Sequence, residues 1–450
     1  MASQEEKSKM PKGYVPAWAS RAVSLAINVL LLMQVTFYAT DVLGLDAWLV
    51  GALLLGSKFF DGFTDLVVGY VVSKTNSKLG KARPYELMII PLWICTILLY
   101  STPNIGTVGQ AIWLVVFYSL INSICATFLN ATDAIYMGRS LPDERHQGTV
   151  LSINGIIIFM CGIMVSMMLP QLMNTWGRAP GGWTKIAMVI GIPMLVIGMG
   201  RFIFIKETVA IEKADDESRK MSLVESMKAL SHNKYIFILA GSLLLSNVMS
   251  TISSAISTYY FEWIVGDLGL LTVASAVGLV APFVLLLFPI AMKSIGAMNF
   301  IRIGLVVAAI GNGIKIFAGA SLPIIIIGSL LASVGSSFLG LMVNVFLIEC
   351  MEYNEWKTGK RVDGYITAFN NFTGKLGSGI ASGGVGLLMA ATGYVGTAAS
   401  QPDSAMGAIV AMFSWIPAVF CILMLVILGF YDLDKRMPQI KADNEKNRAL

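Results

Sequence analysis

The sequence contains little charge for its length. Only 13% of its 450 residues are Asp, Glu, Lys or Arg, whereas charged residues make up about 25% of a typical soluble domain. Hydrophobic residues account for 56% of the chain, and the mean hydropathy is +0.73. The chain therefore lacks the polar surface that a soluble protein needs, and its composition indicates an integral membrane protein.

Residue types that build many catalytic and metal centres are also scarce. The chain has only 2 histidines, His146 and His232, and its 5 cysteines show neither a CxxC motif nor ligand spacing. No phosphate-binding loop, dinucleotide fingerprint or set of nucleophile, base and orienting group is visible. We therefore expect neither an enzyme nor a resident cofactor, and we interpret the cysteines as small apolar residues in helix packing.

Long apolar runs, in contrast, fill almost the whole sequence. A helix needs about 20 apolar residues to cross a hydrocarbon core about 30 Å thick. Twelve windows of this kind begin near Trp18, Trp48, Glu86, Val108, Gln147, Trp183, Tyr235, Leu270, Asn299, Leu322, Gly364 and Ala405. The N-terminal segment lacks the apolar core and cleavage site of a signal peptide, so we expect the first helix to be retained. The predicted fold is all-α, with twelve transmembrane helices.

A polar stretch near the middle of the chain divides the twelve windows into two sets of six. It contains the run KADDESRK and interrupts the apolar pattern for nearly thirty residues. Two bundles joined by a linker are typical of transporters built from repeats. The predicted organisation is an N-terminal six-helix bundle at 1–205, a cytoplasmic linker at 206–234, a C-terminal six-helix bundle at 235–431 and a cytoplasmic tail at 432–450.

The distribution of basic residues predicts the orientation, because Lys and Arg concentrate in short cytoplasmic loops. The loops after even-numbered windows contain Lys74, Lys78, Lys81, Arg83, Arg139, Arg145, Lys293, Arg302, Lys357, Lys360 and Arg361. Only Arg178 and Lys185 depart from this bias. We therefore expect a multi-pass protein of the cytoplasmic (plasma) membrane with both termini in the cytoplasm. The net charge of +5 follows from these loops and gives no reason to expect a nucleic-acid partner.

The most informative feature is a pair of carboxylates in the second window. Asp61 and Asp65 lie four residues apart in an otherwise apolar stretch, and an acid at the centre of a membrane helix costs roughly 2.5 to 3.5 kcal/mol to insert. At about 100° per residue, Lys58 shares their face and Thr64 lies beside them. Two carboxylates and a hydroxyl form a hard oxygen site that suits Na⁺ or H⁺, and Lys58 can offset their charge when the site is empty. The alternative is a buried ion-pair network that only holds helices together.

Polar residues also interrupt the fourth window. Thr127 and Asn130 are three residues apart and share a helix face. Asp133 lies closer to the expected cytoplasmic end of the same helix. It either contacts a substrate or neutralises basic residues there, and the sequence leaves both interpretations open.

The eleventh window contains Lys375, with Asn371 one turn before it. A lysine at that depth needs a carboxylate partner or an aqueous cavity. Its own segment offers no acid nearer than Asp363, so we expect Lys375 to pair with Asp61 or Asp65 across the two bundles. The alternative is a side chain that reaches back to the membrane surface.

Two long motifs carry a resemblance to a known family. The first is FFDGFTDLVVGYVVSKTNSKLGKARPYE, and the second, much later in the chain, is MEYNEWKTGKRVDGYITAFNNFTGKLGSG. In order and spacing, the chain from about Thr40 to Tyr431 resembles the glycoside–pentoside–hexuronide:cation symporters, the melibiose permease family of the major facilitator superfamily. The resemblance implies the two-bundle fold of that superfamily and cation-coupled sugar import by alternating access.

The same resemblance implies roles for individual residues. It places the coupling cation, which is Na⁺, Li⁺ or H⁺ in that family, at Asp61, Thr64, Asp65 and Thr127, with the two aspartates as metal ligands if the cation is Na⁺. It also makes Lys375 a link between the cation and sugar sites. We expect the substrate to contact a set of polar side chains: Lys58, Asn130, Asp133, Asn154, Asn371 and Lys375.

The chain departs from melibiose permease at two positions that bind the sugar there. The first-helix acid of that protein aligns near Leu25, and its fifth-helix arginine aligns near Asn154, so the resemblance does not identify the sugar. Two other functions stay open on the same fold: a cation-coupled carrier of a lysolipid or organic anion, and a membrane sensor that does not transport. For the symporter, the expected partners are a small-molecule sugar and the lipid bilayer, with the chain as a monomer.

Overall fold

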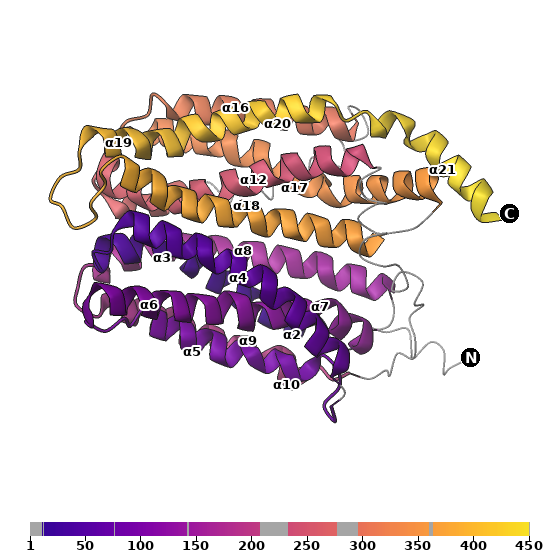
Figure 1. Cartoon of the computed structure of the whole chain (residues 1–450), viewed down its shortest axis with the longest axis horizontal. Helices are drawn as coiled ribbons and strands as arrows, with labels where there is room; N and C mark the ends of the chain where they lie inside the picture. Colours follow the sequence, from indigo (N-terminus) through magenta and orange to yellow (C-terminus); the bar gives the residue numbers. More distant parts are fainter. Residues whose placement is uncertain are drawn as a thin grey trace. The chain divides into compact units, whose positions relative to one another are not determined.

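The computed structural model describes residue 11 and residues 13–75, 77–141, 144–207, 233–276, 296–359 and 363–449. In these residues the regular structure is helical (Figure 1), and the extended backbone pairs only at one bridge between Ser77 and Gly80. The prediction of an all-α fold is therefore confirmed.

The first half of the chain forms its spans partly from consecutive helical segments. Their bounds are α2 (Tyr14–Leu32), α3 (Val35–Phe37), η2 (Tyr38–Val42), α4 (Ala47–Lys74), η3 (Arg83–Met88), α5 (Ile89–Leu99), α6 (Gly106–Ser119), η4 (Leu120–Ala126), α7 (Thr127–Ser140), α8 (Glu144–Trp176), α9 (Gly182–Gly198) and α10 (Gly200–Phe204). The segments η2 and η4 are π-helical and η3 is a 3₁₀ helix. The stretch from α6 through η4 to α7 is therefore one long helix with a π-helical insert.

The second half follows the same plan. Its helices are α12 (Lys234–Tyr260), η5 (Phe261–Val265), η6 (Leu268–Leu270), α13 (Leu271–Ser275), α16 (Ala297–Lys315), α17 (Leu322–Thr358), α18 (Asp363–Ala391), α19 (Asp403–Val410), η8 (Ala411–Trp415), α20 (Ile416–Gly429) and α21 (Leu433–Ala449). Every expected apolar window begins on one of these helices, and the window from Leu270 continues outside the described residues. Within the described residues, 8 helices are long and apolar enough to cross a membrane.

Contacts divide the chain into two compact units. The first contains Met1–Glu212, Asp267–Ser275 and Gly386–Gln401, and the second contains Lys213–Gly266, Ala276–Val385 and Pro402–Leu450. Residues 267–275 and 386–401, which the sequence predicts in the C-terminal bundle, group by their contacts with the first unit. The predicted bounds of the two bundles, the linker and the tail stay predictions.

Helix α4, which carries the two aspartates of the second window, starts at a well-formed cap. The Asp46 carboxylate accepts hydrogen bonds from the backbone N–H groups of Trp48 at 2.8 Å and Leu49 at 3.3 Å. A cap of this type contributes about 1 kcal/mol, because it satisfies N–H groups that have no partner within the helix. It also fixes where α4 begins.

In the second unit, α16 and α17 cross with their backbones almost in contact. A Cβ added at Gly335 would lie 2.2 Å from the carbonyl oxygen of Gly304 and 2.6 Å from the backbone nitrogen of Ala308. A Cβ added at Gly311 would lie 2.5 Å from the backbone nitrogen of Ala332. Small residues permit this close approach between membrane helices, so these glycines are packing residues.

The tail of the chain is the helix α21, which packs against α17 within the second unit. The Trp356 indole N–H donates to the Asp443 carboxylate at 3.1 Å, and the Asn444 amide donates to the Glu352 carboxylate at 3.0 Å. Ile440 of α21 is buried in the core of this unit. The expected tail is therefore a helix that is folded onto the second unit.

Candidate cation and substrate site

Asp61 lies at the centre of the candidate cation site, on α4. It is almost fully buried, with 6% of the residue exposed. One carboxylate oxygen, Oδ1, accepts a hydrogen bond from the Ser123 hydroxyl, and the other, Oδ2, pairs with the Lys58 ammonium at 3.1 Å. Both oxygens of this carboxylate therefore have a partner, as a buried charge requires.

The two expected hydroxyl ligands lie on α4 and at the start of α7, which packs against α4. The Thr64 hydroxyl donates to the Asp61 carbonyl oxygen at 3.0 Å, and the Thr127 hydroxyl donates to the Asn122 carbonyl oxygen at 3.1 Å. Because backbone carbonyls hold both hydrogens, each hydroxyl oxygen still has lone pairs for a cation. Asp65 follows Asp61 by one helical turn and is partly buried.

The fourth span becomes π-helical where it contacts α4. This segment, η4, carries Ser123, which is completely buried. Short π-helical turns inside α-helices are frequent at functional sites. Ser123 was not among the predicted ligands, because a serine in an apolar run usually bonds to its own helix and gives no sign of a partner elsewhere.

The oxygen atoms around Asp61 suit a monovalent cation. Lys58 balances the charge of Asp61 through their ion pair, and Asp65 adds a second carboxylate one turn further along α4. The Lys58 ammonium also lies 5.5 Å from the centre of the Tyr118 ring, a second weak attraction that holds it beside Asp61. The carboxylate and hydroxyl oxygens are the ligand type that hard cations prefer.

Two of the expected substrate residues of the first unit lie in contrasting environments. Asn130 on α7 is exposed, whereas Asn154 on α8 is only 9% exposed. The side-chain oxygen of Asn154 is buried and has no hydrogen-bond partner among the residues that the structure describes. An unsatisfied buried acceptor costs about 1–3 kcal/mol, so Asn154 is suited to accept a hydrogen bond from a bound solute or water.

Two further expected substrate residues, Lys375 and Asn371, belong to α18 of the second unit. Lys375 is exposed, and the Asn371 side chain lies outside the described part of the structure. The expected pairing of Lys375 with Asp61 or Asp65 would join the two units and stays a prediction.

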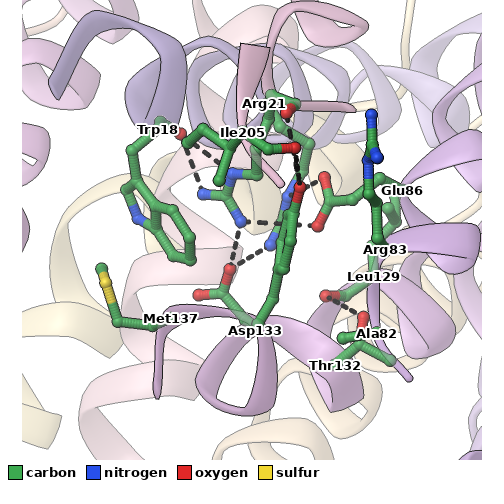
Figure 2. Close-up of polar contacts among 12 residues, drawn as sticks. Trp18, Arg21, Ala82, Arg83, Glu86, Leu129, Thr132, Asp133, Met137 and Ile205 are labelled. Atoms are coloured by element: carbon green, nitrogen blue, oxygen red, sulfur yellow. Dashed lines mark hydrogen bonds and ion pairs between the residues drawn. The ribbon is translucent and has the colours of Figure 1, made fainter. Parts of the chain in front are cut away.

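Asp133 belongs to an ion-pair cluster of the first unit (Figure 2). Its Oδ1 atom accepts hydrogen bonds from Arg21 and Arg201, the second at 2.5 Å. The Glu86 carboxylate lies 3.4 Å from Nε of Arg21 and 3.6 Å from Nη1 of Arg201. Arg21, Glu86 and Arg201 are at most 2% exposed, while the Asp133 side chain is 41% exposed. Two positive and two negative charges from α2, η3, α7 and α10 thus neutralise one another.

Trp18 holds one arginine of this cluster in place. Arg201 donates from Nε and Nη2 to the Trp18 carbonyl oxygen at 3.1 and 2.9 Å, and its guanidinium lies 3.6 Å from the centre of the indole ring. These contacts support one of the two interpretations left open for Asp133, namely that it neutralises basic side chains. Its place among the substrate contacts stays a prediction.

The loop that follows α4 is bound by a carboxylate from the end of the sixth span. Glu207 accepts hydrogen bonds from the backbone N–H groups of Lys81 at 3.0 Å, Ala82 at 2.7 Å and Arg83 at 2.8 Å, and from Nε of Arg139 at 2.7 Å. Burial alone would raise the pKa of Glu207, but these four donors together lower it below its usual value of 4.5. Glu207 lies within the predicted linker, and its carboxylate fixes the loop at Lys81.

Comparisons with known proteins agree with this membrane fold. The family described as MFS/sugar transport protein matches residues 14–435. An isoprimeverose transporter from Lactiplantibacillus pentosus is 28% identical over 98% of this chain and 94% of its own length. A glucuronide carrier protein homolog from Escherichia coli (strain K12) is 26% identical over 96% of this chain and 95% of its own length.

Solved structures support the same conclusion about the fold. A bacterial homologue of the human lysosomal transporter Spinster has a TM-score of 0.68 at 10% identity, with 96% of this chain and 99% of that chain covered. A D-xylose-proton symporter has a TM-score of 0.66 at 13% identity, with 93% and 97% covered. At these identities, the likeness shows the fold alone.

Proposed function

Because the chain belongs to the MFS/sugar transport protein family, we propose that it imports a sugar or glycoside together with a coupling cation by alternating access. A multi-pass membrane transporter of this family has no need of an enzyme's catalytic groups. The sugar assignment rests on the family and on the sugars that the names of its relatives mention.

One observation carries the coupling part of the proposal, namely the buried carboxylate of Asp61. A carboxylate inside a membrane helix is costly unless something neutralises it. Here the neutralising group is the Lys58 ammonium at 3.1 Å, and a hydroxyl occupies the other oxygen. A bound cation can replace both the Lys58 ammonium and the Ser123 hydrogen bond at Asp61. The site can therefore alternate between a form with a bound cation and a form in which Asp61 pairs with Lys58.

Coupling follows from this exchange. A cation that binds at Asp61 and Asp65 takes over the neutralisation of Asp61 and frees Lys58 to turn toward another partner. If the occupied form binds the sugar more tightly, the sugar must raise the affinity for the cation by the same factor, because coupling free energies are reciprocal. Movement of the two bundles around the occupied site would then carry both solutes across the membrane.

The coupling cation is Na⁺ or H⁺ in this proposal, and Li⁺ is a substitute for Na⁺. We also propose that the protein acts as a monomer in the plasma membrane with both termini in the cytoplasm, since the basic residues concentrate in the loops of one side. Asn130, Asn154, Asn371 and Lys375 are the proposed sugar contacts, together with Lys58 once a cation has displaced it.

Uptake by vesicles tests the proposal. Vesicles that contain the wild-type protein are offered a panel of labelled mono-, di- and trisaccharides and uronides, with and without an inward Na⁺ or H⁺ gradient. We expect one class of sugar to accumulate only with a gradient. Asp65→Asn should abolish accumulation, because it removes one of the two charges that attract the cation.

Asp46→Asn is the matched control, because asparagine caps a helix about as well as aspartate and Asp46 lies on the same helix outside the site. It should accumulate sugar like the wild type. Accumulation by Asp65→Asn at the wild-type level would reject the cation site. Accumulation of a lysolipid or organic anion instead of any sugar would favour a carrier of those solutes. Sugar binding without sugar transport would favour a membrane sensor.

A further inference from the structure

We propose that Ser123 is a further ligand of the coupling cation and that its hydroxyl allows the site to accept Na⁺ and Li⁺ in addition to protons. This inference rests on the proposed function. It concerns which cations the site accepts, and it assigns a role to a residue of the fourth span that lies outside the expected set of ligands.

The carboxylate acceptor distinguishes Ser123 from the other serines that are 0% exposed. Ser242 and Ser414 donate to carbonyl oxygens four residues earlier in their own spans, and Ser24 donates to the Met194 carbonyl oxygen on α9. The Ser123 hydroxyl instead donates to Oδ1 of Asp61 on a different helix. A side chain that leaves its own helix to contact a membrane carboxylate is placed for more than local packing.

The two oxygens of Asp61 have different partners, and this difference locates the cation. Oδ2 is paired with the Lys58 ammonium at 3.1 Å. Oδ1 contacts a neutral hydroxyl, so a cation can approach that oxygen without meeting a positive charge in contact with it. Because Oγ of Ser123 lies within hydrogen-bond distance of Oδ1, one small cation can contact both atoms.

The exchange at Ser123 requires only rotation of the hydroxyl. The Ser123 hydroxyl donates its hydrogen to Asp61, whereas a bound metal ion needs an oxygen lone pair at the same place. Rotation about the Cβ–Oγ bond turns the hydrogen away and presents a lone pair to the ion. No covalent bond changes and no proton is released.

Protons and metal ions differ in how much they need this oxygen. Na⁺ and Li⁺ must replace their water ligands with several protein oxygens, as hard cations do. A proton binds to one carboxylate oxygen and needs no further ligands. Loss of the Ser123 oxygen should therefore weaken binding of Na⁺ and Li⁺ and leave proton-driven transport nearly unchanged.

The test compares Ser123→Ala and Ser123→Cys with the wild type in sugar uptake at increasing Na⁺, increasing Li⁺, and in Na⁺-free buffer with an inward proton gradient. Both variants should need about ten- to a hundredfold more Na⁺ or Li⁺ for half-maximal uptake, a factor typical of a lost polar contact to a charged group. Cysteine keeps the shape of serine and replaces a hard oxygen with a soft sulfur. Ser123→Cys therefore keeps the test valid if the alanine variant does not fold.

Ser414→Ala is the matched control, a fully buried serine whose hydroxyl bonds only to its own helix, and its activation by Na⁺ should match the wild type. Unchanged activation of both Ser123 variants by Na⁺ and Li⁺ would overturn the inference. An equal loss of Na⁺-driven and proton-driven uptake would also overturn it, because that pattern indicates a structural role. A wild type driven by protons but indifferent to Na⁺ and Li⁺ rejects the inference alone, whereas a wild type without any cation dependence rejects the proposed function.

Discussion

Asp133→Asn should destabilise the first unit, because it removes one of two carboxylates from a cluster that contains two buried arginines. Arg21 and Arg201 both donate to the same Asp133 oxygen. The substitution leaves two guanidinium groups facing Glu86 alone, at distances of 3.4 and 3.6 Å. The cluster then has a net charge of +1 where it previously had none.

The magnitude follows from the burial of the four groups. Removal of one partner from a fully buried ion pair costs about 3–5 kcal/mol, because the remaining charge is left without compensation. The Asp133 side chain is 41% exposed, so solvent screens part of its interaction and we expect a smaller loss of about 2–4 kcal/mol. Trp18 and Glu86 remain as partners of Arg201, which limits the loss further.

Thermal unfolding of the purified protein in detergent measures this effect. The apparent unfolding temperature of Asp133→Asn should fall by on the order of 5 °C or more, whereas Asp403→Asn, at an exposed acid, should behave like the wild type. The double variant Asp133→Asn/Arg21→Gln leaves Arg201 and Glu86, so the cluster is neutral again. Its loss in free energy of unfolding should be at least about 1 kcal/mol smaller than the sum of the losses of the two single variants. Additive losses, or a stable Asp133→Asn variant with impaired sugar binding, would refute the structural role and favour a substrate contact.

Two further predictions concern packing and pH. Gly335→Ala should destabilise the second unit by about 1–3 kcal/mol or more, because its Cβ would lie 2.2 Å from the Gly304 carbonyl oxygen. Gly340→Ala is the control, because Gly340 lies on the same helix with open space around it. Equal unfolding temperatures for the two variants would contradict the close crossing of α16 and α17. Glu207→Ala should lower the unfolding temperature near neutral pH, since it removes the acceptor for three backbone N–H groups and Arg139. The pKa of Glu207 is lowered in the folded protein, so its contribution is present above about pH 4.5, its usual pKa, and is lost as pH falls through the lowered value. A difference between wild type and Glu207→Ala that does not shrink at low pH would contradict this.

Hydropathy predicted the helices well, because a membrane span must be apolar along almost its whole length. The same requirement made Asp61 and Asp65 visible, since each interrupts an apolar run. The pairing of Asp61 with Lys58 follows from a separation of three residues on one helix face. Local spacing of this kind can be worked out from sequence alone.

The contacts between distant helices could not be predicted in this way. Arg21 and Glu86 lie near the ends of expected windows, where charged residues are common, so nothing indicated that both are buried with Asp133. The partner of Ser123 depends on the π-helical register of η4 and on the packing of that segment against α4. Glu207 follows the last turn of its span, and only the path of the chain brings it to the loop at Lys81.

The central claim is that sugar and cation cross the membrane together, and sugar-induced cation uptake tests it most directly. Vesicles that contain the wild-type protein are equilibrated without any ion gradient. The sugar that the uptake panel identifies is then added outside, and the external Na⁺ concentration and pH are recorded. The account predicts that inward flow of the sugar draws Na⁺ or H⁺ into the vesicles, and that Asp65→Asn abolishes this flow. Entry of sugar into wild-type vesicles without movement of either cation would contradict the account.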